Sequence, residues 1–350
     1  MKKILIYVSA VCFCIFFIPM IIVLGGAGSS FLINDNSVLP TENNPQNSIN
    51  IEETPPAEIL QEDIVLDIYN KDTKSIFQMN LEEYIACVVI AEMPAYFEIE
   101  ALKAQSVAAR TYTYRKVLAP DDDHEGMLCT ESAHCQAFRD LKNVTESTPN
   151  RLGVGAMSAQ ERIAKVKQAV EDTKGIIICH DGMPIEALYH SCSGGMTEDA
   201  ENVWGNEKAY LKAVESHGEE AGDTKYKQTI SFSKTDFIKK MKAEYSEIMV
   251  SEEQLFSSIK NVRRSESGRV LTLTIGNIEL TGKELRTIFK INSTNIQFKE
   301  NKENIEITTL GYGHGVGMSQ FGADARAKEG KAFQEILKHY YTGVELQNIG

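Results

Sequence analysis

The first segment of the chain most strongly constrains how the protein can be built. After Lys2 and Lys3, no charged residue occurs from Ile4 to Asn34, and the first part of this run is almost entirely apolar. About 20 apolar residues suffice to cross the hydrocarbon core of a bilayer, and basic residues beside such a run favour the cytoplasmic side. The sequence therefore predicts a transmembrane helix at residues 1–28, with the rest of the chain outside the cytoplasm.

A cleaved signal peptide is the alternative interpretation of this segment. The apolar run is longer than that of a typical signal peptide, and no clear small-residue cleavage site follows it. An uncleaved anchor in the cell membrane is therefore the prediction.

Residues 29–58 differ in composition from the segments on both sides. They are rich in Asn, Pro, Glu and Ser and contain few residues that could form a core. Segments of this composition do not bury enough apolar surface to fold, so a flexible linker is expected here. A globular domain at 59–350 follows.

The charge of the chain limits the class of partner. Its formal net charge is −13, whereas proteins that bind nucleic acid gather Lys and Arg against the phosphates. We therefore expect no nucleic acid as a partner, and neutral, polar or basic partners instead.

Strand and helix patterns alternate along the globular domain. Asn80 is expected to cap a helix that ends near Met93, because Pro94 disfavours helical geometry in the residue before it. The pattern of apolar and polar residues changes at 228–300, where an alternating hairpin pattern predicts a second lobe. The predicted fold class is α+β with two lobes.

Glu92 is the polar residue in the most unusual place. It closes an apolar helical stretch directly before Met93 and Pro94. A carboxylate at a helix C-terminus lies near the negative end of the helix dipole, and apolar neighbours also disfavour its charged form. Both effects should raise its pKa, as a general acid at neutral pH requires. A solvent-exposed glutamate at an ordinary helix end is the alternative.

A loop after the second expected helix gathers residues that can bind a metal. The four are His124, Cys129, His134 and Cys135. Two Cys and two His fill the tetrahedral shell of a structural Zn²⁺ ion and leave no open position. A disulfide between Cys129 and Cys135 is the alternative outside the cytoplasm, and His124 is the least certain ligand.

Glycines recur at every second position from Gly311 to Gly317. The spacing of a phosphate-binding loop is absent, so close backbone packing is the expected role of these glycines.

Four motifs in one order carry a resemblance to a known family. They are "AEMP", "EALKAQSVAARTY", "ALYHSCSGGMTEDAENVWG" and "GYGHGVGMSQFGADARAKEG". Together they resemble the stage II sporulation protein D family of peptidoglycan lytic transglycosylases, over about residues 63–343. The resemblance implies two lobes flanking a glycan-binding cleft.

The resemblance also assigns expected roles to individual residues. Glu92 is expected to be the catalytic acid, and a set of cleft residues is expected to bind substrate: Lys103, Arg110, Tyr189, Ser193 and His314. A structural salt bridge to Glu98 or to another lobe is the alternative for Arg110. A buried, hydrogen-bonded histidine is the alternative for His314, and the single tryptophan, Trp204, is expected to pack.

The reaction implied is cleavage between N-acetylmuramic acid and N-acetylglucosamine in strands stripped of stem peptides. The acid protonates the bridging oxygen and the sugar's own C6 hydroxyl attacks C1, so a second carboxylate is not required. The family also includes clostridial relatives with a zinc site in the region of Cys129. The rival function is a non-catalytic glycan-binding enhancer of a cell-wall amidase.

The resemblance finally implies a setting. The partners expected are peptidoglycan strands, a sporulation amidase (stage II sporulation protein P) and a membrane protein (stage II sporulation protein M). The expected location is the mother-cell side of the sporulation septum, during engulfment of the forespore, with the catalytic domain outside the cytoplasm.

Overall fold

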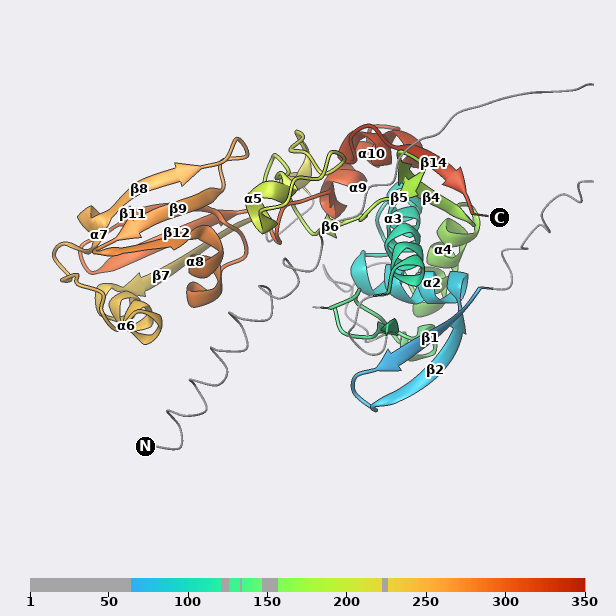
Figure 1. The fold of residues 1–350 in the computed structure, drawn as a ribbon, viewed down its shortest axis with the longest axis horizontal. Coiled ribbons are helices and arrows are strands. Elements are labelled where there is room, and N and C mark those ends of the chain that lie inside the picture. Colours follow the sequence, from blue (N-terminus) through green and yellow to red (C-terminus); the bar gives the residue numbers. More distant parts are fainter. Residues whose placement is uncertain (1–63, 121–125, 133, 147–156, 222–225, 350) are drawn as a thin grey trace, which may run out of the picture. The chain divides into compact units, whose positions relative to one another are not determined.

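Residues 64–120, 126–132, 134–146, 157–221 and 226–349 are described by the structure, a computed structural model. All of them belong to one compact unit, Ala57–Gly350. Several small sheets and a set of helices build this unit (Figure 1), which confirms the α+β class. The predicted anchor and linker lie outside the described residues. Among the helices that are described, none is both long enough and apolar enough to span a membrane.

The first elements of the unit form a hairpin followed by two consecutive helices. They are β1 (Val65–Asn70), β2 (Ser75–Asn80), α2 (Leu81–Glu92) and α3 (Ile99–Leu118). As predicted, Asn80 caps α2, by accepting a hydrogen bond from the Glu82 amide. Pro94 holds Met93 in an extended conformation, so Glu92 is the last residue of α2.

Helix α3 forms the centre of the first core. It packs against α2, against α4 (Ala159–Glu171) and against two C-terminal helices, α9 (Gln320–Lys328) and α10 (Phe333–Tyr340). Its sequence makes this possible because four alanines on it are fully buried and let neighbouring helices approach closely: Ala101, Ala104, Ala108 and Ala109. We call the part of the unit around this core the body.

Short strands complete the body. β4 (Ile176–His180) and β5 (Met183–Pro184) form a hairpin, in which Asp181 and Gly182 both have positive φ. β14 (Glu345–Asn348) pairs with β4, β3 (Leu128–Cys129) with β1, and β6 (Tyr189–His190) with β13 (Met318–Ser319). The short helix α5 spans Ala200–Trp204, and 3₁₀ turns span Leu141–Asn143 and Glu219–Ala221.

The second lobe has its own sheets and its own apolar core. Its strands are β7 (Lys227–Ser233), β8 (Ile259–Arg264), β9 (Val270–Ile275), β10 (Ile278–Thr281), β11 (Asn295–Glu300) and β12 (Asn304–Leu310), and its helices are α6 (Lys234–Glu244), α7 (Leu255–Ser258) and α8 (Gly282–Phe289). β9 and β10 form the predicted hairpin. β12 pairs with both β7 and β11, so the lobe extends to Leu310, past the expected end near 300.

The glycine loop after β12 brings the body and the second lobe together. A Cβ atom on Gly317 would lie 2.0 Å from the Leu188 carbonyl oxygen, and one on Gly315 would lie 2.5 Å from the Arg269 guanidinium carbon. Both glycines also have positive φ. The predicted close backbone packing is confirmed, and it places Arg269 of the second lobe directly against the loop of the body.

Candidate functional site

The Glu92 carboxyl group is held at the end of α2 by the loop that follows the cysteine pair. The side chain is half-buried, and the Ala137 amide donates a hydrogen bond of 2.7 Å to its Oε1. An amide donor at one oxygen fixes the carboxyl plane and places the proton of the acid form on the other oxygen. The Glu92 carboxyl group is therefore held in one orientation.

Tyr189 and Gln136 extend the surroundings of Glu92. The Tyr189 hydroxyl donates to Gln136 Oε1 at 2.8 Å, and Gln136 Nε2 donates to the Thr113 hydroxyl on α3 at 3.0 Å. Burial raises the pKa of Tyr189 well above its usual value, and the negative charge of Glu92 raises it further. Tyr189 is thus a neutral phenol close to the acid. We call Glu92, Gln136, Ala137 and Tyr189 the acid site.

Three of the four predicted metal ligands lie together next to the acid site. The ligand atoms of Cys129, His134 and Cys135 all lie within 4.8 Å of one another, and His134 Nδ1 is 3.2 Å from the Cys129 sulfur. Both cysteines are free thiols. Burial raises the pKa of Cys135 to about 11, so its thiol is protonated at pH 7. A nearby cation would be needed to stabilise the thiolate form.

This donor set suits Zn²⁺, which prefers sulfur and imidazole ligands. His124 lies outside the described residues. Cys135 is followed directly by Gln136 and Ala137, the two residues that contact Tyr189 and Glu92. A metal held here would anchor the segment that positions the acid.

Lys103 lies on α3 with its amine between two carboxylates. Its Nζ is 2.9 Å from Glu100 and 3.0 Å from Asp172, and the hydrogen bond to Glu100 raises its pKa. The amine thus joins α3 to the end of α4. These two carboxylates account for the position of the Lys103 amine. The contact of Lys103 with substrate stays a prediction.

Arg110 is fully buried, and the structural alternative fits its contacts. Its Nε and Nη2 donate to the two oxygens of Glu82 at 2.8 and 2.6 Å, and its other donors reach the Ile176 and Val170 carbonyls. The salt-bridge partner is Glu82 on α2, not Glu98. A side chain with 0% exposure cannot reach a glycan in this structure, so Arg110 stabilises the body.

Ser193 is also buried, at 1% exposure, because a carboxylate that the sequence analysis missed holds it. Its hydroxyl donates to Glu219 at 2.8 Å. Cys192, Gly194 and Ser216 donate to the same buried carboxylate. Ser193 therefore fixes the loop before Gly194 and does not face a cleft.

The backbone around His314 holds its ring in place. Its Nδ1 accepts the Val316 amide at 3.0 Å, and it forms a backbone hydrogen bond with Tyr189. Burial lowers its pKa to about 4, and the charges of Arg286 and Arg269 act in the same direction. The His314 ring is therefore neutral at pH 7. It offers a substrate an uncharged ring surface rather than a positive charge.

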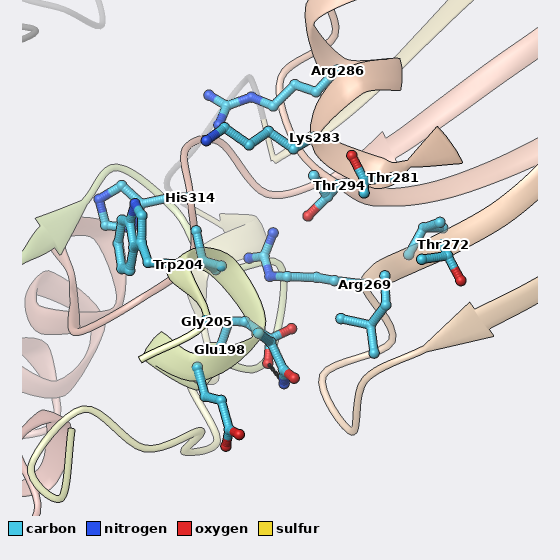
Figure 2. Close-up of a pocket in the computed structure, with 15 residues that line it drawn as sticks. Glu198, Trp204, Gly205, Arg269, Thr272, Thr281, Lys283, Arg286, Thr294 and His314 are labelled. Carbon is cyan, nitrogen blue, oxygen red and sulfur yellow. Dashed lines mark hydrogen bonds between the residues drawn. The ribbon is translucent and has the colours of Figure 1, made fainter. Parts of the chain in front are cut away.

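The His314 ring faces a pocket of about 810 Å³ (Figure 2). Trp204 lies beside it at 5.2 Å between ring centroids and is 44% exposed, so the expectation that Trp204 packs is wrong. The second lobe contributes Arg269, Lys283 and Arg286. We call this the junction pocket. Sequence reasoning missed its cations, although Lys283 and Arg286 are three residues apart and so share one face of α8.

Comparison with known proteins agrees with the family resemblance. The family model described as Stage II sporulation protein matches residues 69–180, which include Glu92 and the cysteine pair. Stage II sporulation protein D of Bacillus amyloliquefaciens is 32% identical, over 99% of this chain and 96% of that protein. The protein of that name from Bacillus subtilis (strain 168) is 31% identical, also over 99% of this chain and 96% of that protein.

A more distant relative is the amidase enhancer of Bacillus subtilis (strain 168), which is 29% identical over 74% of this chain and 39% of its own length. The first two relatives match nearly the full length of both chains at more than 30% identity. The chain therefore belongs to the stage II sporulation protein D family.

Proposed function

We propose that this protein is a peptidoglycan lytic transglycosylase of sporulation, with Glu92 as its catalytic acid. Membership of a sporulation family supports a role in the cell wall of the sporulating cell. The observation that carries the catalytic proposal is the orientation of the half-buried Glu92 carboxyl group by the Ala137 amide, beside the neutral Tyr189. The substrate is the bond between N-acetylmuramic acid and N-acetylglucosamine in strands without stem peptides.

The reaction balances with one carboxyl group. Glu92 gives its proton to the bridging oxygen, and the bond from that oxygen to C1 of N-acetylmuramic acid breaks. The C6 hydroxyl of the same sugar forms a new bond to C1 and loses its proton to the Glu92 carboxylate. Water is not consumed, Glu92 is restored, and the product carries a 1,6-anhydro end.

A structural Zn²⁺ ion belongs to the same proposal. Cys129, His134 and Cys135, with His124 as the fourth ligand, would hold it. The ion would supply no step of the reaction. It would fix the segment that carries Gln136 and Ala137, and so the direction of the acid.

The setting is proposed from the sequence and the family. The N-terminal anchor would hold the protein at the mother-cell side of the septal membrane, with its enzymatic domain outside the cytoplasm. An amidase such as stage II sporulation protein P would supply stripped strands, and stage II sporulation protein M would be the membrane partner.

A second function has support from one relative. The amidase enhancer at 29% identity favours a non-catalytic role, in which the protein binds glycan and activates an amidase.

Digestion of stripped glycan strands tests the first proposal against the second. The wild-type chain should release fragments with 1,6-anhydro ends, which are one water lighter than hydrolysed ends in a mass spectrum. Glu92→Gln should keep the fold and abolish cleavage, because an amide cannot release a proton. Glu83→Gln, an exposed residue of the same helix, is the matched control and should cleave normally.

The other outcomes are equally informative. Ordinary reducing ends would mean that water is the nucleophile and that a second carboxylate takes part. Cleavage by Glu92→Gln at the wild-type rate would remove Glu92 from the mechanism. Absence of cleavage by the wild-type chain, together with activation of an amidase, would favour the enhancer.

A further inference from the structure

The junction pocket is built from two separate parts of the sequence. One wall comes from α5 and the glycine loop, with Trp204 and His314, and the other from β9 and α8 of the second lobe. Its volume of about 810 Å³ lies in the range of sites that enclose a small ligand. Glu92 is not among the residues that line it, so the pocket is a second feature beside the acid site.

Positive charge in this pocket is left without carboxylate partners. Lys283 and Arg286 form no hydrogen bond or ion pair through their side chains within the described part of the chain. Figure 2 shows both side chains reaching from α8 toward the side where Trp204 and His314 lie. Burial lowers the pKa of Arg286, so this cation has lost part of its water without gaining a counterion.

Arg269 adds a deeper charge beneath the pocket. It is 2% exposed, and its Nη1 and Nη2 donate only to neutral oxygens, the Ser293 hydroxyl at 2.8 Å and the Ser193 carbonyl at 2.6 Å. Its Nε is buried without a partner among the described residues. Burial lowers the pKa of Arg269, and the charges of Glu198 and Glu219 oppose that shift. Arg269 is therefore balanced within the fold and is too deep to contact a ligand, which leaves Lys283 and Arg286 as the cations available to one.

The acidic residues of the pocket form no ion pair with Lys283 or Arg286 within the described residues. The Glu198 carboxylate is engaged on both oxygens, by the Asp199 amide and Asn202 at one and by Ser267 and Ser265 at the other. Glu201 is exposed on α5. The positive charge of the pocket that has no carboxylate partner among the described residues is therefore that of Lys283 and Arg286, in a chain whose net charge is −13.

Trp204 supplies a flat apolar surface next to these charges. It is the last residue of α5, and Gly205 ends the helix in a left-handed conformation. The neutral His314 ring lies 5.2 Å away, tilted by 58°. An exposed aromatic face suits the apolar face of a pyranose ring, while neighbouring donors bind its polar substituents.

We propose that the junction pocket binds an N-acetylmuramic acid unit whose lactyl carboxylate is free, with the sugar on Trp204 and the carboxylate on Lys283 and Arg286. This inference rests on the proposed function, in that the ligand is a peptidoglycan strand. In a unit that still carries its stem peptide, the lactyl carbonyl is a neutral amide and offers no charge to Lys283 and Arg286. The pocket thereby distinguishes stripped units from substituted ones, because a charge-assisted pair is stronger than a neutral one.

The fluorescence of the only tryptophan in the sequence reports on this pocket directly. The full chain, in mild detergent and with Glu92→Gln to keep strands intact, is titrated with a stripped tetrasaccharide of alternating N-acetylglucosamine and N-acetylmuramic acid. Chitotetraose has the same backbone without carboxylates. We expect a saturable change of Trp204 emission with the stripped strand and at least tenfold weaker binding of chitotetraose. The difference should shrink in high salt.

Variants test the two cations. Lys283→Met and Arg286→Met should each weaken binding of the stripped strand about tenfold and leave binding of chitotetraose unchanged. Lys239→Met, an exposed lysine on α6 of the same lobe, is the matched control and should bind like the parent chain. The indole N–H resonance of Trp204 gives a second readout from the same residue.

Several results would overturn the inference. They are equal binding of stripped strand and chitotetraose, equal binding of the methyl ester of the stripped strand, and absence of any response from Trp204. Preference for a muramoyl peptide or a free stem peptide over the stripped strand would assign the carboxylate to the peptide instead. Cleavage by the wild-type chain without a Trp204 response defeats only this inference, whereas a carboxylate-dependent response without cleavage defeats only the proposed catalysis.

Discussion

Two arginines of this protein are withdrawn from water in opposite ways. Arg110 in the body is fully buried, and its guanidinium group meets both oxygens of Glu82 and two backbone carbonyls. Arg286 at the junction pocket is half-buried and has no such partner among the described residues. A satisfied buried cation stabilises a fold, whereas a half-buried cation without partners is ready to bind an anion.

The same difference separates the acid site from the junction pocket. Hydrogen bonds from Ala137 and to Gln136 fix the acid site without help from a ligand. The pocket, by contrast, exposes Trp204, and within the described ranges Lys283 and Arg286 have no carboxylate partner. Groups that perform chemistry benefit from being fixed in advance, and groups that select a ligand benefit from gaining their partners only when it binds.

The largest expected effect concerns the metal site. Its loss should impair cleavage at the acid site and leave binding at the junction pocket unchanged. The wild-type chain should contain about one zinc ion, and Cys129→Ser with Cys135→Ser should remove it. Because Gln136 and Ala137 would lose their anchor, cleavage should fall about 10- to 100-fold and the melting temperature should drop. Metal analysis, digestion and calorimetry measure the three effects.

The pocket provides the control for that experiment. Binding of a stripped strand at Trp204 should change little in the double variant, and Cys179→Ser, at a buried cysteine of β4, should keep the metal. Absence of zinc in the wild-type chain, with thiols that react only after reduction, would replace the ion by a disulfide.

The next prediction compares how much each of the two arginines contributes to the stability of the protein. Arg110→Met should lower the free energy of unfolding by about 3–5 kcal/mol, because it leaves the Glu82 carboxylate without its partner. Arg286→Met should change it by less than about 1 kcal/mol. Chemical denaturation measures both. Equal losses would show that Arg286 also stabilises the fold, contrary to the distinction drawn above.

The fold was easier to predict from sequence than the site. The Asn80 cap and the break at Pro94 follow from local backbone chemistry, and both are confirmed. Ser193 and Arg110 were misplaced because their partners, Glu219 and Glu82, lie 26 and 28 residues away in the chain. Local patterns do not contain such pairings.

The junction pocket was missed for a related reason. Trp204 and Arg286 belong to segments that come together only because Gly315 and Gly317 allow close packing. The alternating glycines did indicate close packing, but they did not indicate which side chain lies against them. In contrast, Cys129, His134 and Cys135 were found because their ligand types are close in sequence.

A smaller effect is the pH dependence of stability. The folded-state pKa of His314 is about 4, below its usual 6.5, so the unfolded chain binds a proton that the folded chain resists. The contribution is fully present above pH 6.5 and is lost as pH falls toward 4, by about 3 kcal/mol. The neighbouring His190 is lowered in the same direction by burial, by His314 and by Arg269. The melting temperature should fall as pH is lowered from 7 to 4, and it should fall less steeply in His314→Gln than in the wild-type chain. An unchanged slope would assign the effect to His190 or to carboxylates.

The smallest effect tests whether the Tyr189 hydroxyl positions the acid site. Tyr189→Phe removes the bond to Gln136 but keeps the Tyr189 backbone that contacts His314. We expect kcat for glycan cleavage to fall about 3- to 10-fold with little change in KM, and the free energy of unfolding to fall by about 1 kcal/mol. Tyr341→Phe is the matched control because its buried hydroxyl donates to the Leu188 carbonyl at 2.8 Å. It should lose similar stability and keep its kcat. If both variants lose kcat equally, Tyr189 contributes only to stability, and the orientation of Glu92 rests on the Ala137 amide.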